Sequence, residues 1–167
     1  MNTSLRLALS VSILCLAACG GGTSGYANNP QAVGQFAKDV RGNRALLVAS
    51  LPSPAETAMI CASPEDAKLV DAYVAELAKT LPAEGISGDA EQTEVLVKST
   101  TTAALRAGTD QELSGGYTET ASRYKDGLDF YAFSYVKPGE SLGVRFDACT
   151  HVNGRLVFVP KMWRAFR

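Results

Sequence analysis

The hydrophobic and polar positions of the amino-terminal half follow the period of an α-helix. Four apolar residues recur at the i, i+3, i+4, i+7 spacing that lines one helix face, namely Val33, Phe36, Ala37 and Val40. Asn29-Pro30 precedes them, and asparagine caps free backbone amides while proline suits the first helical position. The pattern predicts a helix from residue 30, and Gly42-Asn43 ends it.

A longer helix is predicted after a second start signal. Ser63-Pro64 supplies a cap and a first-turn proline, and Glu65-Asp66 places negative charge where the helix dipole favours it. One apolar stripe follows, consisting of Leu69, Val70, Tyr73, Val74, Leu77 and Leu81. Pro82 ends this helix, because proline cannot continue the hydrogen-bond ladder.

The segments around these two helices carry weaker signals. Residues 44–51 are apolar and suit either a strand or a helix, and residues 55–61 and 118–125 suit short helices. A helix is predicted from Asp89 to Ala107, with Gly108 as the residue that ends it. The run Thr100-Thr101-Thr102 disfavours this helix, because β-branched side chains lose rotamer freedom there.

The carboxyl-terminal part changes to strand-like patterning. Residues 142–152 alternate apolar and polar positions, and residues 128–136 and 155–160 are rich in aromatic and β-branched residues. Lys137-Pro138-Gly139-Glu140 and Val152-Asn153-Gly154-Arg155 are turn sequences between them. The pattern therefore predicts an α+β fold, with a helical amino-terminal layer on an antiparallel β-meander. This order of elements is similar to that of the NTF2-like and cystatin-like superfolds.

Charge and composition exclude several classes of function. The net charge is −1 at pH 7, which gives no electrostatic footprint for nucleic acid. The chain has one histidine, His151, and no closely spaced cysteine pair suited to zinc, so neither a metal nor a cofactor is predicted. Residues 155–167 contain four basic residues and no acid. They suggest either a solvated basic terminus or contact with anionic lipid or glycan.

The first residues have the layout of a secretory signal. Met1–Arg6 is short and carries one positive charge, and residues 7–18 are uncharged and mostly apolar. This run is too short to cross a bilayer, which needs about 20 apolar residues. Cys19 follows, and after it comes a Gly- and Ser-rich stretch that resembles a tether more than a phosphate loop.

The four residues Leu16-Ala17-Ala18-Cys19 resemble the lipobox of bacterial lipoproteins. The resemblance implies that residues 1–18 are removed, that Cys19 carries the lipid, that 19–29 is a flexible tether and that 30–167 is one globular domain. Several acyl chains would anchor the protein stably. Gly20, in place of aspartate, favours the outer membrane, with the domain facing the periplasm. The alternative is an ordinary secreted protein cut near Ala18.

Two cysteines remain once Cys15 is removed and Cys19 is lipidated. Cys61 and Cys149 form an even pair, and an oxidising compartment favours a disulfide bond between them. The alternatives are two buried thiols or one reactive cysteine.

Candidate catalytic groups are sparse. Asp147, Cys149 and His151 are predicted on one strand face, but at i+2 spacing their side chains are about 7 Å apart, which is too far for a Cys–His nucleophilic pair. Asp126, Asp129 and Glu140 could supply a carboxylate pair for glycoside hydrolysis only if two of them lay close together. No Gly-x-Ser-x-Gly motif occurs.

The strand at 128–136 is predicted to be apolar on both faces. Tyr131, Phe133 and Tyr135 share one face, which must be either covered by a helix or exposed for recognition. We therefore expect a non-enzymatic, membrane-anchored envelope domain that uses this face to bind an envelope protein or cell-wall glycan. The alternative is a small envelope hydrolase with a pocket between the sheet and the helices.

Overall fold

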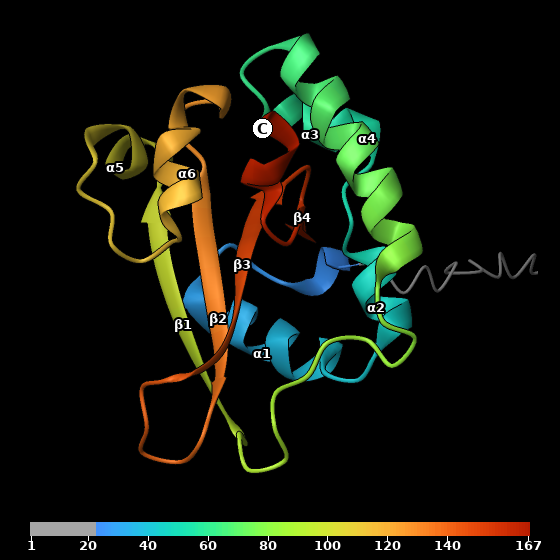
Figure 1. The fold of residues 1–167 in the computed structure, drawn as a ribbon, viewed down its shortest axis with the longest axis vertical. Coiled ribbons are helices and arrows are strands. Elements are labelled where there is room, and N and C mark those ends of the chain that lie inside the picture. Colours follow the sequence, from blue (N-terminus) through green and yellow to red (C-terminus); the bar gives the residue numbers. More distant parts are fainter. Residues whose placement is uncertain (1–22) are drawn as a thin grey trace, which may run out of the picture.

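The structure is a computed structural model that describes residues 23–167. Its centre is one antiparallel sheet whose strands lie in chain order, with helices on both faces (Figure 1). The strands are β1 (Glu94–Thr101), β2 (Asp129–Val136), β3 (Gly143–Val152) and β4 (Arg155–Phe158). The α+β class is confirmed. The likeness to NTF2-like or cystatin-like proteins stays a prediction.

The three carboxyl-terminal strands and both turns occur where the sequence predicts them. The β3–β4 hairpin turns at Asn153 and Gly154, whose φ angles are 52° and 74°. Those left-handed values suit the tight turns that match strand twist, which is why Asn-Gly is a strong hairpin signal. In the β2–β3 turn, the Glu140 amide donates to the Lys137 carbonyl at 3.0 Å, and Gly139 has a φ of 76°.

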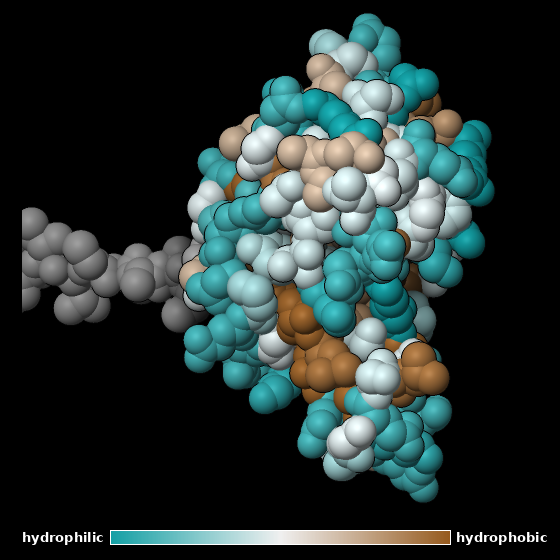
Figure 2. All heavy atoms as spheres, turned by 90° about the vertical axis from the view of Figure 1, so that its left-hand side faces the viewer, coloured by the Kyte–Doolittle hydropathy of each residue, from teal (hydrophilic) through white to brown (hydrophobic). Residues whose placement is uncertain are grey.

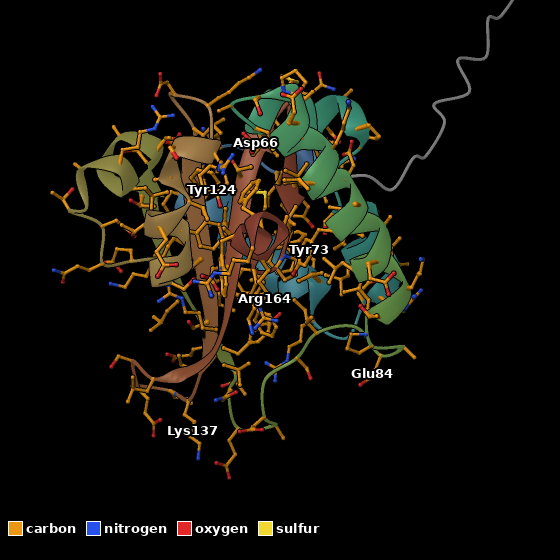
Figure 3. The ribbon with its side chains drawn as sticks, turned by 45° about the horizontal axis from the view of Figure 1, so that its top comes forward. Asp66, Tyr73, Glu84, Tyr124, Lys137 and Arg164 are labelled. Carbon is orange, nitrogen blue, oxygen red and sulfur yellow. The ribbon has the colours of Figure 1, made fainter. Side chains whose placement is uncertain are left out.

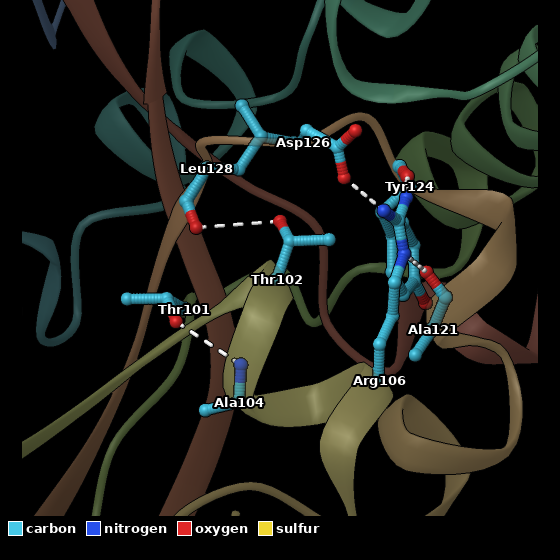
Figure 4. Close-up of polar contacts among 8 residues, drawn as sticks. All are labelled: Thr101, Thr102, Ala104, Arg106, Ala121, Tyr124, Asp126 and Leu128. Carbon is cyan, nitrogen blue, oxygen red and sulfur yellow. Dashed lines mark hydrogen bonds and ion pairs between the residues drawn. The ribbon is translucent and has the colours of Figure 1, made fainter.

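The predicted helix over 89–107 is wrong for most of its length. Residues 94–101 form strand β1, and only α5 (Thr102–Ala107) is helical, ending at Gly108 as predicted. The Thr run marks the boundary. The Thr101 hydroxyl accepts from the Ala104 amide at 3.2 Å and caps α5, while the Thr102 hydroxyl donates to the Leu128 carbonyl at 3.3 Å (Figure 4). Pairing with β2, at 129–136, overrides the local helical pattern.

The predicted amino-terminal helices are present. They are α1 (Pro30–Val40), α2 (Arg44–Ala49), α3 (Pro54–Ile60) and α4 (Pro64–Thr80). Helix α6 (Gly115–Glu119) and the short 3₁₀ turns η1 (Thr23–Gly25), η2 (Ala121–Arg123) and η3 (Met162–Phe166) complete the described part. One position of the predicted α4 stripe differs, because Leu69 is 48% exposed. No helix among residues 23–167 is long and apolar enough to span a membrane.

The sheet has a hydrophobic core on each face. We call the first the α1-side core; its members include Val33, Phe36, Tyr131, Phe133, Tyr135, Cys149 and Phe158. We call the second the α4-side core; its members include Cys61, Val70, Tyr117, Tyr124, Phe130 and Ala132. The predicted single helical layer is therefore two layers, because β2 is apolar on both faces and each face needs a cover.

Residues 23–29, predicted as part of the tether, pack on the domain. Thr23 is buried, and η1 lies against β4. The Tyr26 ring stands edge-on to Phe36 with centroids 5.4 Å apart, and the Tyr131 hydroxyl donates to the Asn28 side chain at 3.0 Å. The packed region therefore begins before residue 30. The rest of the predicted tether, the signal segment and Cys19 lie outside the described residues.

Candidate functional site

The predicted partner-binding face of β2 is core. Phe133 and Tyr135 are fully buried and Tyr131 is 4% exposed, all beneath α1. The Tyr135 hydroxyl donates to the Ala37 carbonyl of α1 at 2.6 Å, so its polar end is satisfied inside the protein. The prediction that Tyr131, Phe133 and Tyr135 form an exposed recognition surface is wrong.

The two cysteines of the described chain are free and buried, so the predicted disulfide bond is not present in the structure. Cys61 belongs to the α4-side core and Cys149 to the α1-side core. The sheet lies between these cores, whereas a disulfide needs Cβ atoms about 4 Å apart. Burial raises the pKa of the Cys61 thiol to about 12 and raises the pKa of the Cys149 thiol well above its ordinary value. Neither is an activated thiolate.

The candidate catalytic side chains on β3 do not share one face. The partner of Tyr131 on β3 is Cys149, and that of Ala132 is Asp147, so Ala148 is an extra residue that forms a β-bulge. The bulge turns Asp147 toward the face of Ala132, opposite to that of Cys149. The prediction of one shared face is wrong, because the alternation assumes an unbroken pleat.

The candidate carboxylates are held apart. Asp126 forms an ion pair with Arg106 (Figure 4), and Asp129 accepts from the Asn28 side chain at 2.8 Å. Asp129 begins β2, whereas Glu140 lies beyond its other end. Seven residues of strand separate these ends by roughly 23 Å. Among residues 23–167, no group of three His, Cys, Asp or Glu side chains is arranged to hold a metal ion.

The strongest candidate site is the free edge of β1. The Thr102 amide donates to the Leu128 carbonyl at 3.0 Å, which identifies that pair as hydrogen-bonded in the β1–β2 register. Such pairs alternate along an antiparallel ladder. The backbone N–H and C=O groups of Val95, Val97 and Ser99 therefore point away from β2. Among the described residues, no hydrogen bond outside the ladder uses these groups.

A groove follows the first half of this edge, between β1 and α1. Its volume is about 760 Å³, which is within the range of ligand-binding clefts. Val95 and Val97 line one wall, and Gln31, Gln35 and Lys38 of α1 line the other. Gly34 of α1 lies opposite Val97, and a Cβ there would make an ordinary van der Waals contact of 3.5 Å with a Val97 methyl carbon. Figure 2, which faces this side, shows a hydrophobic area surrounded by hydrophilic residues.

A second hollow continues along the other half of the same edge. It has a volume of about 400 Å³ and is lined by Ser99–Thr101 of β1 and by Thr109–Glu112 of the loop after α5. Asp110 and Glu112 make this wall acidic, although Glu112 also pairs with Lys98 at 3.3 Å. The two hollows together border the edge from Val95 to Thr101.

The opposite edge of the sheet is closed. The Phe158 amide of β4 donates to the Ser50 carbonyl at 2.8 Å, just after α2. Arg155 of β4 donates to the Ala49 and Leu51 carbonyls at 2.7 and 3.0 Å. The turn η1 also packs against β4. Covering one edge and leaving the other accessible makes β1 the pairing edge of this sheet.

Comparison of this chain with protein-family models, curated proteins and solved structures finds no match. The candidate site therefore rests on geometry. Sequence reasoning missed it because residues 94–101 were predicted to be helical. The β-branched residues Val95 and Val97, together with the Thr run, were the available signal.

Proposed function

We propose that this protein is an envelope lipoprotein, anchored in the outer membrane through Cys19, whose domain binds an extended peptide segment of a partner protein along β1. The observation that supports this most strongly is the row of outward backbone groups on Val95, Val97 and Ser99, bordered by two hollows. In β-strand addition, such groups bind a peptide backbone, and neighbouring hollows accept alternate side chains.

The chemistry of the edge favours a peptide over a glycan as the occupant. Donors and acceptors on alternate residues match the repeat of another strand, whereas a glycan presents no such repeat. Val95 and Val97 suit an apolar side chain of the peptide, and Lys38 opposite them suits an acidic or polar one. The turn η1, which begins at Thr23, packs against β4 at the closed edge of the sheet. Strand β1 is at the opposite edge, where a peptide could pair with it.

The anchoring part is tested by mass spectrometry. Protein purified from bacterial membranes should begin at an acylated Cys19, because the lipobox places the processed cysteine at that position. The Cys19→Ala variant should move to the soluble fraction or keep its signal segment. The matched variant Cys15→Ala should remain membrane-bound. An unmodified mature chain that begins at another residue would contradict the anchor.

The binding part is tested with a linear decapeptide selected from a displayed random library against the full chain. Ser99→Pro should abolish its binding, measured by fluorescence anisotropy, because proline removes an outward N–H. Its effect on thermal stability should be small, because prolines are tolerated on edge strands where the N–H faces outward. Ser99→Ala keeps the amide and should bind the peptide with nearly unchanged affinity.

Amide hydrogen exchange supplies a second readout. Binding should slow exchange at Val95, Val97 and Ser99, and it should leave Leu96 and Lys98 unchanged because their amides already pair with β2. Equal protection at odd and even positions would contradict strand addition. Light scattering that shows dimers of the chain blocked by Ser99→Pro would instead assign the edge to a second copy.

A further inference from the structure

A separate pocket lies between α4, β3 and the carboxyl-terminal segment. Strand β4 ends at Phe158, which pairs with Cys149, so the earlier part of β3 has no β4 neighbour. The chain continues beside β3 after β4 ends: the Val159 amide donates to the Ala148 carbonyl at 3.1 Å, and the Lys161 amide donates to the Asp147 carbonyl at 2.7 Å. The pocket has a volume of about 300 Å³ and borders Tyr73 and Leu77 of α4. A small ligand would fit it.

Three cationic side chains line this pocket. They come from separate places: Arg145 from β3, Lys161 from the turn after β4, and Arg164 from η3. Among the described residues, none of the three has a carboxylate within ion-pair distance. Seven other lysine and arginine side chains of residues 23–167 do form ion pairs. Like charges that outnumber the opposite charges around them repel each other, so an anion would be favoured there.

One wall of the pocket is joined to the segment that carries two of these cations. The Tyr73 hydroxyl donates to the Pro160 carbonyl at 2.7 Å and so joins α4 to the segment that carries Lys161 and Arg164. Figure 3 shows Tyr73 and Arg164 near each other in this part of the molecule. Burial raises the pKa of the Tyr73 phenol, and the nearby Arg164 guanidinium opposes that shift. The Tyr73 side chain is therefore uncharged, and its hydroxyl proton is already donated to the Pro160 carbonyl.

Asp147 is the one acid of the pocket lining. It is 7% exposed, and one of its carboxylate oxygens accepts from the Ser114 amide at 3.3 Å. One carboxylate against three cations leaves the pocket lining positive overall. His151 is not among the lining residues.

We propose that this pocket binds a small molecule through a carboxylate or phosphate group, held by Arg145, Lys161 and Arg164. Arginine forks suit both oxyanions, because each presents paired oxygens to the guanidinium N–H groups. The proposal goes beyond peptide binding and does not depend on it, since the pocket involves neither β1 nor α1.

Fluorescence of Trp163 tests this proposal. It is the only tryptophan in the sequence, and the Arg164 guanidinium carbon lies 5.3 Å from its ring centroid. Inorganic phosphate and succinate are titrated separately into the detergent-solubilised full chain at constant ionic strength, with sodium chloride as the blank. At least one probe should give a saturable fluorescence change. The responding probe distinguishes a phosphate ligand from a carboxylate ligand.

Arg145→Gln should weaken binding of that probe about tenfold or more, the effect of losing one charge-assisted hydrogen bond. The cations over the Trp163 ring are Arg164 and Arg167, so replacing Arg145 leaves the fluorescence signal interpretable. Lys68→Gln, an exposed position on α4 outside the pocket, should keep the affinity. Ser99→Pro should also keep it, which separates this test from the peptide test. No saturation with either probe, or equal weakening by Arg145→Gln and Lys68→Gln, would overturn the proposal.

Discussion

Phe133→Ala should lower the free energy of unfolding of the full chain by about 3–5 kcal/mol, the usual cost of removing a buried phenylalanine. Phe133 is fully buried at the centre of the α1-side core. Its ring centroid lies 5.4 Å from that of Phe146, 5.6 Å from that of Phe158 and 6.2 Å from that of Phe36. Alanine would leave a cavity between α1 and three strands.

Urea unfolding followed by circular dichroism measures this loss, and Phe133→Leu is the control. Leucine keeps much of the volume and should cost less than about 1.5 kcal/mol. The comparison distinguishes a core residue from a recognition residue. A Phe133→Ala variant that keeps normal stability but no longer binds a partner protein would contradict the buried position of Phe133. It would restore the prediction that this face of β2 is a recognition surface.

Arg155→Met should also be strongly destabilising, by about 3–5 kcal/mol, because it leaves a buried charge without its partner. Glu56 is 2% exposed, and its Oε1 lies 3.2 Å from Arg155 Nε. This N–H is not aligned for a hydrogen bond to the carboxylate, so the contact is an ion pair. The same arginine donates to two carbonyls at the end of α2, so its loss also frees those acceptors.

Thermal and urea unfolding check this prediction against two controls. Lys79→Met breaks the Lys79–Glu76 pair, whose side chains are 72% and 65% exposed, and should cost less than about 1 kcal/mol. The double variant Glu56→Gln/Arg155→Met should recover part of the stability, because it removes the uncompensated charge. If Arg155→Met and Lys79→Met cost the same, the buried pair does not hold α3 against β4.

The starts of α1 and α4 were predicted correctly because they depend on contacts between residues that are close in sequence. Asn29 accepts from the Ala32 amide, and Ser63 from the Asp66 amide, so the caps occur at the residues that the sequence indicated. Both are contacts across three residues and need no tertiary partner. The Asn153-Gly154 turn is equally local, since left-handed φ angles are available to those two residues at small cost.

The sequence did not predict strand β1 or the candidate sites, because these depend on contacts between distant residues. Residues 94–101 pair with β2, 28 or more residues later along the chain, and no local pattern reports such a partner. The free edge, its two hollows and the cationic pocket each join segments that are distant in sequence. The Ala148 bulge, which separates Asp147 from Cys149, is likewise a property of strand pairing.

Local patterns were enough to predict the α+β class, the start of each main helix and the order of the three carboxyl-terminal strands, because capping, turn chemistry and side-chain period act over a few residues. The sequence also contains Leu16-Ala17-Ala18-Cys19, whose resemblance to a lipobox is the basis of the proposed anchor. Three features became visible only in the folded chain: α1 covers Tyr131, Phe133 and Tyr135, Cys61 and Cys149 lie on opposite faces of the sheet, and β1 has a free edge. A face that is apolar in sequence must be covered, but which element covers it depends on packing between distant segments.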